Sequence, residues 1–297
     1  MRIFMAGGIT GNLKPLFTKL VEGSEMKVFL AGLNGRRDFL LEERLEEEMK
    51  VFLAGTMYGN QASAIEKLKI KKPLPAILES FYYADEVVEK LIPFYDDFLL
   101  DSGAFTYMTG NGGSVNWEEY IDTYSNFITR NKVDKFIELD IDSIVGYDEV
   151  KRLRKILIEK TGKQPIPVWH KSRGKEEFLR MCEEFPYVAI GGIVTKEIKK
   201  SEYKFFNWFI NQAHQRGTKI HGLGLTSFDA MEKYRFDSVD SSSWTSGNRF
   251  GHICKFDGRR VRNISPPQGK KLSDSRLVAI NNFNEWVKFS KYAETYL

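Results

Sequence analysis

The sequence has few cysteines and no long hydrophobic run. Its 297 residues include only two cysteines, Cys182 and Cys254, which cannot form a disulfide framework and lack the close spacing of a cysteine-rich zinc site. No stretch approaches the roughly 20 apolar residues that a membrane helix needs, and the first residues do not resemble a secretion signal. We therefore expect a cytoplasmic protein with no membrane partner and no bound metal.

The sequence also has no marked excess of charge of one sign. Its 44 lysines and arginines face 40 acidic residues, so the net charge of +4 gives no evidence for a polyanionic partner. Hydrophobic residues make up 42% of the chain, enough for the core of one large α/β domain or two smaller ones. The glycine-rich stretch at 6–12 lacks the Gly-Lys-Ser/Thr ending of a phosphate-binding loop, which indicates a simple turn.

A short phrase occurs three times near the start of the chain. Residues 2–7 read RIFMAG, and residues 27–32 and 50–55 both read KVFLAG. The repeat stops after its third copy, and the acidic run at 42–48 is typical of a solvated helix face, so a local duplication explains it better than a solenoid. We expect 1–48 to be an N-terminal extension and 49–297 the main domain, in which only the third copy is needed as a core strand.

From residue 50 onward, strand-like and helix-like segments alternate. Short runs rich in β-forming residues lie near 50–54, 98–101, 135–141, 166–169, 187–191, 219–223 and 237–241. Helical spacing occupies 116–131, 147–160, 175–184, 202–216 and 275–296. This alternation predicts a parallel (β/α)8 barrel of the TIM type, closed by the C-terminal helix, with a doubly wound open sheet as the alternative. An N-terminal copy of the repeat and residues 252–258 are the two candidates for the eighth strand.

The ends of these predicted strands carry polar side chains and glycines. In a barrel, the carboxyl ends of the strands hold the functional residues. In this sequence those ends carry Asp101, Ser102, Gly103, Asp140, Asp142, His170, Gly191, Gly192, Gly222, Gly224 and Asp240. Each alone is compatible with a turn or a helix cap, but their recurrence at one level of the sheet favours a site.

Strand alternation predicts which of these side chains face the site. In the run at 135–141 and the residue after it, alternation places three apolar residues on one face and Glu138, Asp140 and Asp142 on the other. We expect these three acidic side chains to point to the mouth of the barrel. Asp237 and Asp240 are three positions apart on an extended strand and face opposite ways, so we expect only one of them to reach the site.

Four strand ends resemble, in order, the motifs of the tRNA-guanine transglycosylases. Residues 101–105 (DSGAF) resemble their Asp-Ser-Gly-Gly-Phe signature, and residues 189–197 (AIGGIVTKE) resemble their Gly-Gly strand end. Residues 221–227 (HGLGLTS) are similar to a later Gly-x-Gly strand, and residues 237–244 (DSVDSSSW) to the Asp-x-Phe-Asp-Ser-Ala-Ser-Tyr pattern of the archaeal branch. Together the motifs span roughly half of the chain.

The sequence departs from that family in two places. The family's structural zinc, held by three closely spaced cysteines and a histidine, has no counterpart here, so we expect no zinc subdomain. Where the family presents a glutamine to the base, residues 167–174 read PVWHKSRG, which leaves His170 as the substitute. A short, zinc-free chain resembles the phage and bacterial transglycosylases that place 7-deazaguanines in DNA, which implies the bacterial or infected host cytoplasm and makes 49–297 a transglycosylase-like barrel.

The resemblance implies a reaction and roles for the aligned residues. It makes Asp240 the nucleophile that attacks C1′ and expels guanine, and Asp101 the general acid/base that serves both the departing and the incoming base. It implies that Asp140, with Asp142 as competitor, accepts hydrogen bonds from the guanine-like ring, while backbone N–H groups of the Gly-Gly strand end face its O6. The remaining implied substrate-binding positions are Ser102, Gly103, His170, Gly191, Gly192, Gly222 and Gly224. No cofactor is needed, because the bond broken and the bond made are similar in energy.

Basic residues suggest a surface for nucleic acid. Residues 255–276 are a predicted basic loop, interrupted by the Pro-Pro-Gln-Gly of 266–269. The candidates for phosphate contacts are Lys171, Arg173, Arg249, Arg259, Arg260, Arg262, Lys270 and Lys271. A solvated surface loop with no partner is the alternative.

These patterns leave several functions to compare. The first is a glycosyltransferase that exchanges guanine for a 7-deazaguanine such as 7-cyano-7-deazaguanine (preQ0) in DNA, with the target nucleotide turned out of the duplex. A helicase-like or other protein is a candidate partner for opening the duplex. The second is the same exchange on tRNA, as in queuosine or archaeosine formation. The third is a nucleic-acid-binding partner subunit without turnover, and a nucleoside hydrolase is a fainter fourth.

Overall fold

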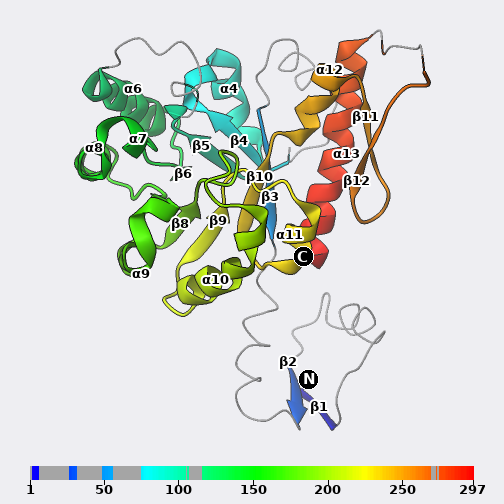
Figure 1. Cartoon of the computed structure of the whole chain (residues 1–297), viewed down its shortest axis with the longest axis horizontal. Coiled ribbons are helices and arrows are strands. Elements are labelled where there is room, and N and C mark those ends of the chain that lie inside the picture. The colour runs from blue at the N-terminus through cyan, green and yellow to red at the C-terminus, as the bar shows by residue number, and fades with distance from the viewer. Residues whose placement is uncertain are drawn as a thin grey trace. The chain divides into compact units, whose positions relative to one another are not determined.

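The protein is described here by a computed structural model of the whole chain (Figure 1). The structure describes residues 2–6, 27–31, 49–55, 75–104, 106, 116–268, 272 and 274–297. The chain divides into two compact units, Met1–Glu48 and Met49–Leu297. In the first unit, the first two copies of the repeat form strands β1 (Arg2–Ala6) and β2 (Lys27–Ala31), which pair in parallel with each other.

The second unit is a (β/α)8 barrel, as the alternation of segments predicts. Its eight parallel strands are β3 (Lys50–Ala54), β4 (Ile77–Ser80), β5 (Phe98–Asp101), β6 (Lys135–Phe136), β7 (Val168–Trp169), β8 (Tyr187–Ile190), β9 (Lys219–Gly222) and β10 (Ser238–Ser241). Neighbours in the sheet are neighbours in the sequence, and the last strand, β10, pairs with the first, β3. A parallel bridge between Ile137 and Ile166 joins β6 to β7 and closes the ring.

Apolar side chains lie on both faces of the strands, as expected for a parallel sheet that is covered on both sides. Side chains such as Phe52, Leu99 and Val168 pack together in one buried cluster. Their neighbours Val51 and Leu100 belong to two other buried clusters that include residues of the helices. The first cluster is therefore the barrel interior, and the other two are the layers between strands and helices.

Helices surround the strands (Figure 1). The α-helices after β4 are α4 (Glu86–Leu91), α6 (Trp117–Arg130), α7 (Asp142–Val145), α8 (Tyr147–Thr161), α9 (Gly174–Glu184), α10 (Phe206–His214), α11 (Phe228–Lys233), α12 (Ser246–Phe250) and α13 (Ser275–Tyr296). The helix expected at 275–296 is confirmed as α13, whose N-cap Asp274 accepts hydrogen bonds from two backbone N–H groups. It packs against β3, and Trp244 both contacts its Phe283 and donates a hydrogen bond to Ala54 O at 2.8 Å. No helix in the described part of the chain is long and apolar enough to cross a membrane.

Two expectations about the sheet were wrong. The eighth strand is β4, with the sequence ILES, and neither candidate supplies it. This strand is only four residues long and includes Glu79, so the sequence shows no clear apolar run there. Residues 252–258 instead contribute β11 (Ile253–Phe256), which forms an antiparallel hairpin with β12 (Val261–Ile264), so part of the predicted basic loop is regular structure.

Candidate active site

The carboxyl ends of the barrel strands bring together three aspartates. Asp101 ends β5, Asp240 lies in β10, and Asp140 follows β6 just before α7. The charges of Asp140 and Asp240 both act on Asp101, so the three carboxyl groups share one region of the barrel mouth although they lie up to 139 positions apart in the sequence. The structure thus brings together the three aspartates that the motifs single out.

The surroundings of Asp101 favour its protonated form. Burial, together with the negative charges of Asp140 and Asp240, raises the pKa of Asp101 to about 7, although hydrogen bonds from backbone N–H groups oppose the shift. One of these bonds comes from Gly103 N to Asp101 Oδ2 at 2.9 Å. A carboxyl group with a pKa near neutrality can both donate and accept a proton, which is what a general acid/base needs.

The turn after Asp101 depends on a glycine. Gly103 has a φ of +78°, and a Cβ built there would lie 2.7 Å from Tyr82 Cβ. Ser102 is fully buried, and its hydroxyl has no hydrogen-bond partner among the described residues. The Asp-Ser-Gly phrase is therefore a constrained turn that fixes the Asp101 carboxyl at the strand end.

Asp240 is held through one of its two carboxylate oxygens. Its Oδ1 accepts a hydrogen bond from Gly224 N at 2.5 Å and lies 3.2 Å from His221 Nε2. Within the described part of the chain, the hydrogen-bond partners of this carboxylate all contact Oδ1 and none contacts Oδ2. Gly224 has a φ of +72°, which turns its N–H toward the carboxylate. Gly222 precedes it in β9, where a Cβ would crowd Leu225 at 3.3 Å.

His221 was not among the predicted site residues. It is fully buried, and its Nδ1 lies 2.5 Å from Ser238 Oγ, which in turn contacts the hydroxyl of Tyr187. These three side chains and Asp240 form one hydrogen-bonded chain through the barrel interior. The signal that could have identified His221 is register, because β9 and β10 pair it directly with Ser238.

Asp237 makes its contacts just before the start of β10. Its Oδ2 lies 3.0 Å from His214 Nε2 and accepts a hydrogen bond from Ile220 N at 2.7 Å. Asp237 precedes β10, whereas Asp240 lies near the carboxyl end of that strand. Only Asp240 is therefore part of the site.

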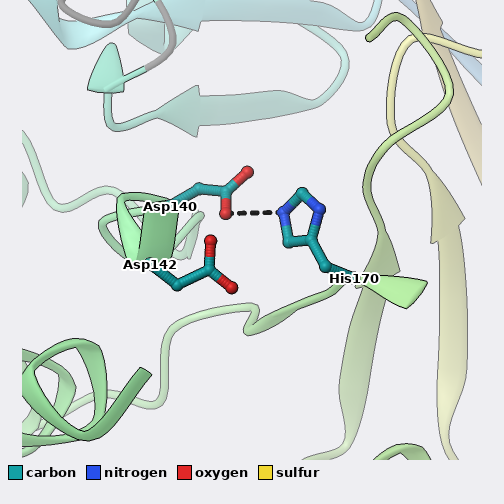
Figure 2. A group of neighbouring side chains, drawn as sticks. All are labelled: Asp140, Asp142 and His170. Carbon is teal, nitrogen blue, oxygen red and sulfur yellow. Dashed lines mark hydrogen bonds and ion pairs between the residues drawn. The ribbon is translucent and has the colours of Figure 1, made fainter. Parts of the chain in front are cut away.

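His170 is clamped between the carboxylates of Asp140 and Glu197, and Figure 2 shows its contact with Asp140. Its Nε2 lies 2.8 Å from Asp140 Oδ1, and its Nδ1 lies 2.9 Å from Glu197 Oε2. Burial alone would lower the pKa of His170, but these two hydrogen bonds and the nearby negative charge outweigh it and raise the pKa to about 9. His170 is therefore an imidazolium at neutral pH, with both N–H groups already donated. Glu197 was not predicted as a site residue, and its pairing with a residue 27 positions away has no sequence signal.

The two glycines after β8 make room for this clamp. A Cβ at Gly191 would lie 2.8 Å from His170 Cε1, and one at Gly192 would lie 2.7 Å from Glu197 Oε2. The expected role of the Gly191 N–H toward the base was wrong, because that N–H donates to Trp169 O at 2.9 Å within the sheet. The Gly192 N–H has no such partner in the described part of the chain.

Glu138, Asp142 and Arg173 form an ion cluster next to this clamp. It corrects the expectations that Glu138 points to the mouth and that Arg173 binds a phosphate. Glu138 does not point to the mouth: it is fully buried, with Oε2 2.5 Å from Arg154 Nε. Asp142 Oδ2 lies 3.0 Å from the Arg173 guanidinium, which also contacts Glu138 and stacks on the Tyr147 ring at 4.1 Å. The side chain of Arg173 is only 2% exposed, so it is not available to bind a phosphate.

Asp140, Asp142 and His170 are also close enough to hold a metal ion. Their nearest ligand atoms all lie within 4.8 Å of one another. However, a histidine must be neutral to ligate a metal, and both nitrogens of His170 are engaged with carboxylates. Asp142 is moreover neutralised by Arg173. The donor set therefore fits a hydrogen-bonded clamp better than a metal site.

The other predicted phosphate contacts are mostly paired within the protein. Both Arg259 and Arg260 make two hydrogen bonds to Glu232, at 2.6 to 2.9 Å, and Arg262 pairs with Asp257. Lys171 Nζ lies 2.6 Å from Glu202 Oε1. The remaining candidates, namely the side chain of Arg249 together with Lys270 and Lys271, lie outside the described residues.

No family model matches the chain, and no curated protein matches it. Among solved structures, a putative fructose-1,6-biphosphate aldolase from Coccidioides immitis aligns with a TM-score of 0.53 and 13% identity over 89% of this chain and 96% of that one. A type I 3-dehydroquinate dehydratase from Clostridium difficile aligns with a TM-score of 0.43 and 13% identity over 66% of this chain and 84% of that one. The carboxyl transferase domain of Rhizobium etli pyruvate carboxylase aligns with a TM-score of 0.44 and 15% identity over 98% of this chain and 53% of that one. The first of these likenesses agrees with the barrel fold, and at 13% identity it carries no argument about the reaction.

Proposed function

We propose that this protein is a glycosyltransferase that exchanges guanine in DNA for a 7-deazaguanine through a covalent aspartyl-sugar intermediate. The observation that carries the proposal is the pairing of two unlike carboxyl groups at one barrel mouth. Asp101 has a pKa near 7 because it is buried beside other carboxylates, whereas Asp240 is fixed through Oδ1 and leaves Oδ2 free of described partners. Such a pair supplies one acid/base and one nucleophile, as cleavage of an N-glycosidic bond with retention requires.

In the first half of the reaction, Asp240 Oδ2 attacks C1′ of the target nucleotide. The C1′–N9 bond breaks, its electron pair stays on the guanine, and the proton of Asp101 neutralises the departing base. In the second half, N9 of the incoming 7-deazaguanine attacks C1′ and loses its proton to Asp101, and the ester bond to Asp240 breaks. Asp101 and Asp240 thus return to their starting states without a cofactor.

Recognition of the base is assigned to Asp140. A guanine-like ring offers donors at N1 and N2, and a carboxylate is their natural acceptor. His170 binds Oδ1 of Asp140 and leaves Oδ2 for the base, and Glu197 holds His170 from its other side. The Gly192 N–H is the backbone donor assigned to O6 of the ring.

The proposal draws its substrate from the resemblance of the strand-end motifs to the tRNA-guanine transglycosylases. The lack of a zinc-type cysteine cluster favours the DNA-modifying branch over the tRNA-modifying one. In either polymer, the same carboxyl groups would act on C1′. The polymer is therefore the part of the proposal that the assay must decide.

The test is incorporation of labelled guanine and labelled 7-cyano-7-deazaguanine into duplex DNA, single-stranded DNA and tRNA, each with wild type and Asp240→Asn. We expect label in DNA, none in tRNA, and none with the variant. Label in tRNA alone would keep the chemistry but overturn the DNA assignment. Release of free guanine without incorporation would indicate a hydrolase, and wild type that binds polynucleotide without exchange or release would indicate a binding subunit.

A further inference from the structure

Four exposed lysines lie in the segment between β8 and α10, which includes the 3-10 helix η5 (Lys200–Phe205). The two elements that bound this segment are labelled in Figure 1. We call Lys196, Lys199, Lys200 and Lys204 the lysine ridge. None of the four has a carboxylate oxygen within 4 Å among the described residues, in contrast to the arginines of the β11–β12 hairpin. Their charges are therefore not neutralised by a salt bridge in the part of the chain that the structure describes.

The acidic residues of the same segment are already engaged. Glu197 holds His170 and accepts a hydrogen bond from Ser172 N, and Glu202 pairs with Lys171 at 2.6 Å. Lys171 is itself half-exposed. The segment consequently presents a surface with an excess of positive charge, which attracts a polyanion.

The lysine ridge begins beside the candidate active site. Lys196 directly precedes Glu197, the residue that holds His170 against Asp140. A Cβ added at Gly224, whose N–H binds Asp240, would lie 2.2 Å from the side chain of Val194, so the loop also reaches the nucleophile's neighbours. A polymer bound along the ridge would therefore lie next to the barrel mouth.

The backbone holds the start of the ridge in a fixed turn. Lys196 has a φ of +62°, a region that non-glycine residues rarely adopt. Its N–H donates to Ile193 O at 3.3 Å, and Ile198 N donates to Gly192 O at 3.1 Å. These hydrogen bonds hold the backbone of Lys196 in that conformation.

Exposed apolar groups accompany the charges. Val194 is 60% exposed and Phe205 48% exposed, and Lys204 Nζ lies 5.3 Å from the centre of the Phe205 ring. Alternation of cations with an aromatic face is the pattern with which proteins bind single-stranded nucleic acid: the cations contact phosphates and the ring stacks on a base.

We propose that the lysine ridge binds the single DNA strand that carries the target nucleotide. The choice of polymer rests on the proposed function. The strand's phosphates contact Lys196, Lys199, Lys200 and Lys204, and an unstacked base packs on Phe205. The ridge thereby takes the role that the sequence assigned to Arg259, Arg260 and Arg262.

The test compares two matched triple variants of the full chain. One is Lys199→Gln, Lys200→Gln and Lys204→Gln, and the control is Arg259→Gln, Arg260→Gln and Arg262→Gln, so that each removes three positive charges. Binding of a fluorescein-labelled single-stranded oligodeoxynucleotide with one guanine is measured by anisotropy over a range of salt concentrations. Thermal unfolding of both variants verifies that they are folded, and the single exposed substitution Lys200→Glu serves if a triple variant is not.

We expect the ridge variant to lose about tenfold or more in affinity, and its slope of log K against log salt to fall by about 2, since each phosphate contact on a single strand contributes about 0.7. The hairpin variant should retain wild-type affinity and slope. Equal losses in both variants, or no loss in the ridge variant, would overturn the inference. For Lys200→Glu we likewise expect weaker binding, and unchanged binding would count against the ridge.

The exchange assay separates this inference from the proposed function. If wild type exchanges base but the ridge variant has an unchanged KM for DNA, the inference fails and the function stands. If wild type shows no exchange while the oligodeoxynucleotide still binds through the ridge, the proposed function fails and the ridge stands as a nucleic-acid surface. Where both hold, the ridge variant raises KM and leaves kcat near that of wild type, because none of its residues touches the reacting atoms.

Discussion

The imidazole of His221 joins the nucleophile candidate to the barrel interior, with Nε2 3.2 Å from Asp240 Oδ1 and Nδ1 2.5 Å from Ser238 Oγ. If the Tyr187 hydroxyl donates to Ser238 and Ser238 donates to Nδ1, the proton of the ring lies on Nε2 and points at Asp240. His221 is then a positioning residue, because it fixes the carboxylate oxygen that does not attack.

Replacement of His221 by leucine should slow base exchange without preventing DNA binding. We expect kcat to fall by about tenfold to hundredfold with little change in KM. This is the range of effects found when a side chain that orients a functional residue, such as a metal ligand, is removed. His221→Gln, which keeps a side-chain N–H, should recover part of the loss. Equal rates for leucine, glutamine and wild type would show that the ring only fills space.

Asp240→Asn should abolish exchange while the protein still binds polynucleotide. The amide has nearly the same volume as the carboxylate, but it cannot form the ester to C1′. Wild type incubated with DNA and quenched with acid should show a covalent protein–DNA species in mass spectrometry, and the variant should not. A covalent species that persists in Asp240→Asn would move the nucleophile to another residue.

Asp101 should make stability depend on pH in the acidic to neutral range. Its pKa is raised from 3.8 to about 7 in the folded protein, so the stabilising contribution of the protonated form is complete below about pH 4 and is lost as pH rises through 7. Asp101→Asn has no such group, and its free energy of unfolding should therefore increase relative to wild type between pH 4 and 7, by on the order of 4 kcal/mol at most. Urea unfolding of both proteins at several pH values measures this difference. A difference that does not change with pH would show that Asp101 titrates normally.

His170 should give a pH dependence in the alkaline range. Because the pKa of His170 is raised from 6.5 to about 9, the stability from its clamp is complete below pH 6.5 and is lost as pH rises through 9. The difference in unfolding free energy between wild type and His170→Gln should shrink over that window, by on the order of 3 kcal/mol. Glu197→Gln removes one of the two carboxylates, so the same transition should then occur at lower pH. If both variants track wild type across the window, the histidine is not held as an imidazolium.

The sequence predicts the barrel well because its signals are local. Apolar runs mark seven strands, and a helical pattern marks α13 at its true bounds. The strand β4 was not predicted, because its four residues include a glutamate and show no periodic pattern. Asp101 and Asp240 could be singled out because each lies at the end of such a run.

The partners of these residues could not be predicted in the same way. Glu197 and His170 lie 27 positions apart, as do Glu232 and Arg259, and which side chains meet depends on how strands and loops are placed in three dimensions. The sequence does not show that a carboxylate neutralises an arginine such as Arg259 in the folded protein. The salt bridges therefore explain why the proposed binding surface is the lysine ridge and not the β11–β12 hairpin.

Pairing of β10 with β3 has a consequence for how activity arises during folding. β10 brings Asp240 to the mouth, and it is both the last strand of the barrel in the sequence and the partner of the first. Pairing of β10 with β3 therefore places Asp240 at the barrel mouth, where its charge acts on Asp101. If the proposed function holds, a chain in which β10 is not paired with β3 separates Asp240 from Asp101 and should not exchange bases.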